Sequence, residues 1–116
     1  MYNGQERRKF KRREKLYIAG VRVKQHEGNE TKSTGWDSVI LHNLSVGGAF
    51  FIYKRDLEIG ALIDLKIDIP ESMLNVNCVG EATRVEQFKS TSLFYTAIKF
   101  INIGVLEEAI VNASVA

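Results

Sequence analysis

The dominant pattern along the chain is an alternation of hydrophobic and polar residues with a period of two, which is typical of strands with one buried face. The clearest case is residues 62–69, where four inward aliphatic positions alternate with positions that include Asp64, Lys66 and Asp68. Turn-forming residues separate the alternating segments. The strands predicted in this way lie at 16–24, 36–42, 49–53, 62–69, 76–86 and 93–100. Six short strands with short connections predict an antiparallel sheet that closes into a small barrel, because closure removes the edges.

Only the end of the chain has a helical period. Asn102 is a candidate N-cap there, and Glu107 and Glu108 lie near the first turn, where the helix dipole favours acids. One apolar stripe follows at helical spacing and is expected to dock on the barrel or on another chain: Val105, Leu106, Ala109, Ile110 and Ala113. The predicted fold is therefore all-β, a six-stranded antiparallel β-barrel with one C-terminal α-helix from about residue 103.

Composition narrows the class of protein. The chain has 116 residues, enough for one ordinary domain, and 45% of them are hydrophobic. Cys78 is the only cysteine, so no internal disulfide is possible, and its place in a strand pattern predicts a small buried residue. With His26 and His42 as the only histidines, a closed zinc module is nearly excluded. No run is apolar enough for a signal-peptide core or a membrane span, so the cytoplasm is the expected compartment.

Charge divides the chain into two parts. The net charge is +2, but residues 1–15 carry seven bases and two acids, a net of +5, while residues 16–116 carry nine bases and twelve acids, a net of −3. The predicted organisation is thus a basic arm at 1–15 and a barrel with its helix at 16–116. A cationic arm on a mildly acidic body indicates an anionic partner for the arm.

Two short motifs carry candidate chemistry. In the run from Arg8 to Arg12, two guanidinium groups could grip phosphates or guanine edges through paired hydrogen bonds, and Phe10 between them could pack the arm onto the barrel. A solvated face or a disordered tail is the alternative interpretation of such a run. In the second motif, from Asn43 to Gly48, side-chain donors and acceptors precede a Gly-Gly pair that permits close approach of the backbone. A polar turn that merely joins two strands is the alternative there.

In their order and context the motifs resemble the PilZ domain, the bacterial receptor module for cyclic di-GMP. That family has an RxxxR motif in an N-terminal arm, matched by Arg8 and Arg12, and a later [D/N]xSxxG motif on the barrel. The second motif is matched by Asn43, Ser45 and Gly48. Residues 80–85 and 95–100 resemble later strands of the family, so the resemblance covers nearly the whole chain and implies a stand-alone six-stranded barrel.

The resemblance also implies roles for these residues. Arg8 and Arg12 would hold the phosphates and guanine edges of cyclic di-GMP, and Gly48 would leave room for the backbone. Asn43 and Ser45 would bind a guanine or a phosphate. Asn43 stands where aspartate is usual, and because a neutral amide is the weaker acceptor, moderate affinity is expected. Arg7 directly precedes the first motif, which in this family favours a stacked pair of ligands, two per chain.

The expected function is that of a receptor whose arm becomes ordered over the barrel when it binds cyclic di-GMP, and whose changed surface is read by an unidentified downstream protein. No cofactor other than this ligand is implied. Arg84 and Trp36 are further candidates for ligand contact, although a solvated strand arginine and a packing tryptophan are the plainer interpretations. The other aromatic side chains are expected mainly in the core: Phe50, Phe51, Phe88, Phe94, Tyr95 and Phe100.

The sequence is also compatible with two other functions. A small barrel with a basic arm could bind single-stranded nucleic acid, although the acidic body disfavours it. The chain could also be a PilZ-like interaction domain without a ligand, although its intact motifs argue against this. An enzyme is not expected, because His26, His42, Cys78 and the acids form no recognisable set of nucleophile, base and orienting group.

Overall fold

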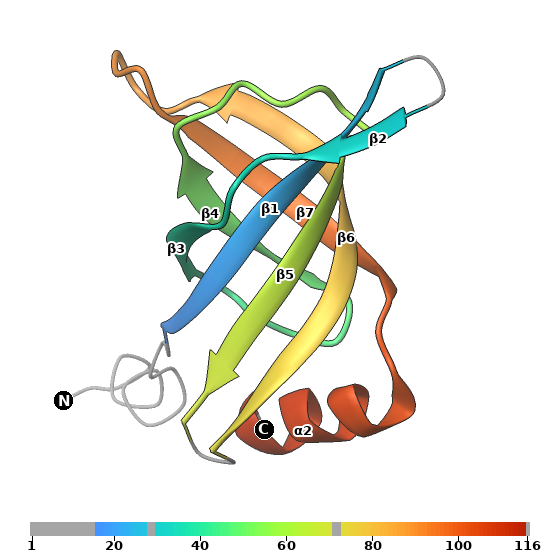
Figure 1. The fold of residues 1–116 in the computed structure, drawn as a ribbon. Coiled ribbons are helices and arrows are strands. Elements are labelled where there is room, and N and C mark those ends of the chain that lie inside the picture. Colours follow the sequence, from blue (N-terminus) through green and yellow to red (C-terminus); the bar gives the residue numbers. More distant parts are fainter. Residues whose placement is uncertain (1–15, 28–29, 71–72, 116) are drawn as a thin grey trace, which may run out of the picture.

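The computed structural model describes residues 16–27, 30–70 and 73–115. Over these residues the order of the elements is β1 (Tyr17–Glu27), β2 (Glu30–Ser33), β3 (Asp37–Leu41), β4 (Gly48–Tyr53), β5 (Leu62–Ile69), β6 (Leu74–Gln87), β7 (Phe94–Asn102) and α2 (Val105–Val115) (Figure 1). The strands pair antiparallel throughout. The predicted all-β fold is confirmed.

Six of the strands form a nearly closed barrel. Along the sheet, β3 pairs with β1, and the path continues through β5, β6 and β7 to β4. A single bridge between His42 and Phe50 joins β4 back to the end of β3. The hairpin of β1 with β2 lies outside this path and was not predicted, because residues 25–33 are almost entirely polar and show no alternation.

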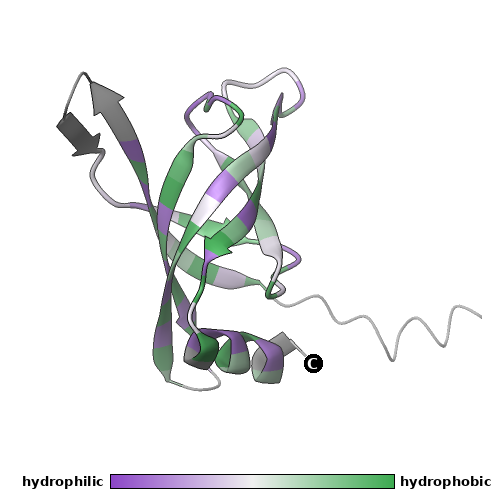
Figure 2. Cartoon of the chain, turned by 90° about the vertical axis from the view of Figure 1, so that its right-hand side faces the viewer, coloured by the Kyte–Doolittle hydropathy of each residue, from purple (hydrophilic) through white to green (hydrophobic). Residues whose placement is uncertain are grey.

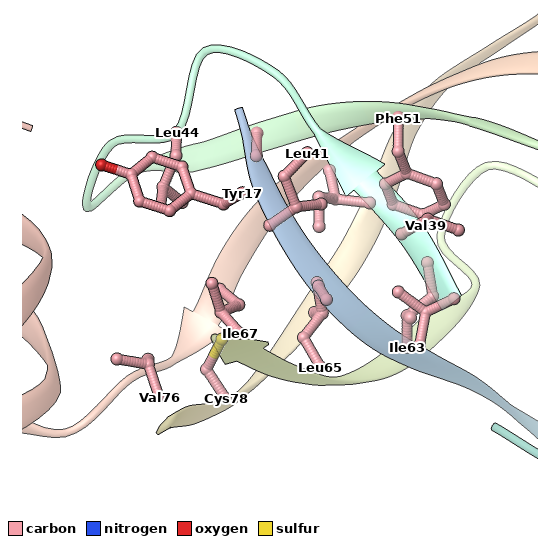
Figure 3. Packing of buried hydrophobic residues seen from close by; sticks show 14 of the residues in the cluster. Tyr17, Val39, Leu41, Leu44, Phe51, Ile63, Leu65, Ile67, Val76 and Cys78 are labelled. Atoms are coloured by element: carbon pink, nitrogen blue, oxygen red, sulfur yellow. The ribbon is translucent and has the colours of Figure 1, made fainter. Parts of the chain in front are cut away.

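The inward-facing aliphatic and aromatic side chains of the alternating strands fill the inside of the barrel. Ile63, Leu65, Ile67 and Ile69 of β5 are all fully buried, as predicted, and Phe51 of β4 is buried with them. Figure 3 shows side chains of β3 and β4 facing those of β5 and β6 across the core. Cys78 is also buried, as predicted, and desolvation raises the pKa of its thiol to about 12.

A hydrogen bond ties β3 to β4 at the end of the barrel away from their bridge. The phenolic hydroxyl of the buried Tyr53 donates to Oδ2 of Asp37 at 2.6 Å. Desolvation, together with this bond, raises the pKa of Tyr53 to about 12. The same bond, with a second one from Lys54, lowers the pKa of Asp37. The pair therefore favours a neutral tyrosine beside an ionised aspartate.

The helix α2 lies across the end of the barrel opposite the Tyr53–Asp37 bond and packs on β5 and β6 (Figures 1 and 2). One detail of its prediction was wrong, and a second holds only in part. Asn102 belongs to β7 and is no N-cap, since the helix begins at Val105. The buried side is formed by Val111, with Ile110 half-buried, while Val105 is 87% exposed and Ala109 and Ala113 are exposed as well. Among the described side chains the contact with the barrel runs through Val111 and Ile110, of which Ile110 belongs to the predicted stripe. The side chain of Leu106 lies outside the described residues, and docking of the exposed members on another chain stays a prediction.

Candidate functional site

The connection between β3 and β4 forms a tight, well-anchored turn that carries the second motif. The backbone N–H of Ser45 donates to the Gly48 carbonyl at 2.9 Å, and the N–H of Gly47 donates to Ser45 Oγ at 3.1 Å. Asn43 adopts a left-handed conformation, with φ of 52°, which asparagine tolerates better than most residues. Leu44 is buried in the core, whereas Asn43 and Ser45 are exposed. The turn thus presents two polar side chains outward on a fixed backbone.

Gly48 has a structural reason to be glycine. A Cβ placed on it would collide with the carbonyl oxygen of Ile98 and lie 3.1 Å from Cα of Lys99, both in the neighbouring strand β7. The N–H of Phe100 donates to the Gly47 carbonyl at 3.0 Å, which holds the turn against the same strand. The absence of a side chain at Gly48 is therefore required for β4 and β7 to approach each other at the foot of the turn.

A row of stacked side chains leads away from the turn over the outer face of the barrel. The His42 ring stacks on Phe50 with centroids 5.0 Å apart, and Phe50 stacks on Tyr95 at 4.7 Å. The Arg84 guanidinium lies 5.6 Å from the Tyr95 ring and donates to Glu86 at 2.8 Å. We call these four residues, His42, Phe50, Tyr95 and Arg84, the aromatic row. It begins at the residue directly before Asn43.

Sequence reasoning missed this row because it assigned aromatic side chains to the core by type. Of that group only Phe51 is fully buried, while Phe50, Phe88, Phe94, Tyr95 and Phe100 are half-buried. The signal was present in the pair Phe50-Phe51, since adjacent residues of a strand face opposite sides of the sheet. With Phe51 inside, Phe50 has to lie outside.

Arg7, Arg8 and Arg12 lie outside the described residues. The register nevertheless shows where the arm is joined to the barrel, because Tyr17, the first residue of β1, pairs with Leu41, the last residue of β3. Two residues after Leu41 comes Asn43. The arm therefore starts from the same end of the barrel as the turn, one strand away from it.

Trp36 lies at the other end of β3 and does not approach the turn. Its ring covers Gly20, where a Cβ would come within 3.3 Å of the indole, and it is flanked by the Arg22 guanidinium at 4.6 Å and Lys66 Nζ at 5.0 Å from the ring centroid. Five residues of β3 separate it from the turn, a length of about 16 Å. Packing on the outer face of β1 accounts for its position.

A comparison with protein families adds the decisive observation. The family model of the PilZ domain matches residues 6–116, essentially the whole chain. The chain belongs to the PilZ domain family. No curated protein and no solved structure was found to match it.

PilZ domains form a family of cyclic di-GMP-binding receptor domains, and the family is not catalytic. The matched range includes both motifs, so the basic run and the turn belong to one PilZ domain. Within the described part of this domain, no group of three or more His, Cys, Asp or Glu side chains could hold a metal ion, and no helix is long and apolar enough to cross a membrane. The high pKa of Cys78 keeps its thiol protonated near neutral pH, which makes it a poor nucleophile.

Proposed function

We propose that this PilZ domain binds cyclic di-GMP between its basic arm and the turn from Asn43 to Gly48. The observation that carries the proposal is the position of the turn, which exposes Asn43 and Ser45 beside the first residue of β1, to which the arm is joined. The ligand has two phosphates and two guanines. It therefore matches an arm with a net charge of +5 and a turn of neutral hydrogen-bonding groups.

Each side of this site would supply a different chemistry. Arg8 and Arg12 would grip phosphates or guanine edges with paired, charge-assisted hydrogen bonds. On the turn, Ser45 Oγ accepts from the Gly47 N–H, and its own proton has only a long contact of 3.5 Å to the Gly48 carbonyl, so it remains available to a ligand. Asn43 offers both a donor and an acceptor but no charge, which favours moderate affinity.

The aromatic row would extend the site beyond the two motifs. His42, Phe50 and Tyr95 form a partly exposed surface next to Asn43, and stacking on aromatic side chains stabilises bound bases by about 1–3 kcal/mol per base. Arg84 at the end of the row adds a guanidinium on the outer face. Together with Arg7, these groups would provide contacts for a second, stacked ligand.

Binding would hold the arm across the turn and so change the surface that a downstream protein reads. A charge-assisted hydrogen bond contributes about 1.5–3 kcal/mol. Ordering a segment on binding costs about 2–5 kcal/mol. Several bonds from the arginines would outweigh this cost, so the arm can act as the moving part of the receptor.

The test is calorimetric titration with cyclic di-GMP, which reports affinity and stoichiometry together. Arg8→Ala and Arg12→Ala should each abolish measurable binding while the circular dichroism spectrum and melting temperature stay unchanged. Lys15→Ala is the matched control, because it removes the same charge from the same arm but leaves both motif arginines, and it should bind within a few-fold of the wild type. Undiminished affinity in both arginine variants would refute the proposal.

The same titration with a single-stranded oligonucleotide at two salt concentrations separates the rival function. Indifference of the wild type to cyclic di-GMP, together with oligonucleotide binding that weakens steeply with salt, would favour nucleic acid as the partner. A chain that binds neither would be an interaction domain without a ligand.

A further inference from the structure

An apolar hollow lies on the outer face of the barrel between the start of β1 and the turn. Ile18 of β1 and Ile40 of β3 face each other in the register and are 58% and 50% exposed. With the half-buried Ile52 of β4 they line a hollow of about 530 Å³, whose rim includes Ser38 and His42. We call Ile18, Ile40 and Ile52 the isoleucine hollow.

The hollow coincides with the seam of the barrel. The bridge between His42 and Phe50 joins β3 to β4, and among the described residues these two strands have no other backbone pairing. Ile40 and Ile52 lie on either side of the unpaired part, two residues past the bridge on each strand. A segment that covers exposed aliphatic side chains at an unpaired strand edge is favoured, because it removes apolar surface from water and shields the unpaired backbone groups of the edge.

The arm is the part of the chain best placed to cover it. Residues 1–15 join β1 at Leu16, which is itself 56% exposed and lies two residues before Ile18. Phe10 lies six positions before Leu16, a reach of up to about 20 Å, and Ile18 lies about 7 Å along the chain from Leu16. Phe10 can therefore fold back onto the hollow. An apolar cavity of about 150 Å³ is enough to hold a benzene molecule, so a phenyl ring fits here with space to spare.

Charge favours the same occupant. Asp68 of β5 is exposed and follows Ile67, which pairs with Ala19, so this carboxylate lies on β5 beside the start of β1. Phe10 has Lys9 and Lys11 as its neighbours in the sequence. A segment with one large apolar side chain between cations is complementary to an apolar hollow with an acid nearby.

We propose that Phe10 docks in the isoleucine hollow and is the positioning residue of the arm. His42 lines the hollow and directly precedes Asn43, so a ring seated there holds Arg8 and Arg12 beside the turn. The docking itself needs no ligand and fixes the arm at one point, so ligand binding would order only the segments that carry the arginines on either side of Phe10. Its effect on cyclic di-GMP affinity rests on the proposed function.

Photochemical cross-linking tests the docking directly. Phe10 is replaced by p-benzoylphenylalanine in the full chain, the dilute protein is irradiated, and tryptic peptides are analysed by mass spectrometry. Cross-links within one chain to Ile18, Ile40 or Ile52 are the expected result. Cross-links to another part of the barrel, cross-links between two chains, or no cross-link at all would overturn the proposal, and those between chains would assign the hollow to a second copy.

Matched isoleucine variants test the consequence for binding. Ile40→Ser should remove the cross-link and weaken cyclic di-GMP binding about tenfold to a hundredfold, as Phe10→Ala should, since this is the range expected for the burial of one Phe side chain. Ile59→Ser is the control, because Ile59 is 65% exposed in the connection between β4 and β5, away from the hollow, and neither readout should change. A cross-link that survives Ile40→Ser would overturn the anchor. Absence of cyclic di-GMP binding in the wild type would instead defeat the proposed function and leave the cross-link standing.

Discussion

Replacing Gly48 by alanine asks whether this glycine of the second motif is required by the barrel itself or only by a ligand. The added Cβ would collide with the Ile98 carbonyl oxygen and come within 3.1 Å of Lys99 Cα and 3.2 Å of the Ile98 carbonyl carbon. All three atoms belong to the backbone of β7, so no side-chain rotation can relieve the contact. The first residues of β4 would have to move away from β7, where Gly48 pairs with Lys99.

The size of the effect follows from these contacts. Overpacking in a well-packed region costs about 1–3 kcal/mol. Movement of the turn would also weaken the hydrogen bond from the Phe100 N–H to the Gly47 carbonyl, worth about 0.5–1.5 kcal/mol. We expect Gly48→Ala to lower the free energy of unfolding by about 2–4 kcal/mol. At about 4 °C per kcal/mol for a domain of this size, the melting temperature should fall by about 8–16 °C.

The assay is urea and thermal denaturation followed by circular dichroism, with two glycine controls in the same chain. At Gly47 a Cβ would meet only Ser45 Oγ, at an ordinary 3.7 Å, and at Gly35 it would meet nothing within 4 Å. Both alanine variants should stay within about 1 kcal/mol of the wild type. If Gly48→Ala proved as stable as Gly47→Ala, the reasoning would be wrong. If Gly48→Ala were this stable but lost cyclic di-GMP binding, the glycine would be required by the ligand and not by the barrel.

Two further predictions concern groups away from the turn. The free energy of unfolding should fall as the pH rises from 10 to 12, because the pKa of Tyr53 is near 10 in the unfolded chain but near 12 in the folded one. Urea denaturation across this range should show a flatter decline for Tyr53→Phe. The decline that comes from the raised pKa of Cys78 should stay the same in both proteins. Trp36→Ala should leave the calorimetric affinity for cyclic di-GMP within about twofold of the wild type, since the ring lies the length of β3 from the turn, and a tenfold loss would contradict this separation.

Period-two alternation was sufficient to predict the barrel because each barrel strand has one face inside a single core. β5 shows this best, since every second residue from Ile63 to Ile69 is buried. The same reasoning could not find β2, because a hairpin outside the barrel path has no alternating pattern to reveal it. It also missed Val111, the fully buried residue among the described side chains of α2, because a helix that contacts the barrel along one edge can do so through a single aliphatic side chain beside Ile110 of the predicted stripe.

The candidate site was predictable in its residue types but not in its arrangement. The motif from Asn43 to Gly48 indicated polar groups on a tight turn, and the structure adds that Gly48 is held by β7 and that Leu44 anchors the turn in the core. Adjacent Phe50 and Phe51 show that one of the two faces outward, but the residue types do not say which one. They also do not give the register across the three strands on which the aromatic row depends. The point at which the arm joins the barrel depends in the same way on the pairing of β1 with β3.

That pairing also supports the proposal that two motifs far apart in the sequence act as one site. Tyr17 pairs with Leu41, and a slip of one residue would turn the buried Tyr17, Ala19 and Val21 toward solvent. The core therefore fixes the register, and the register fixes the distance between the start of the arm and Asn43. A receptor built as proposed would need no contact within the arm to bring its arginines near the turn. It would need only the few residues between Arg12 and Tyr17 as a tether, and an anchor at Phe10 would shorten that tether further.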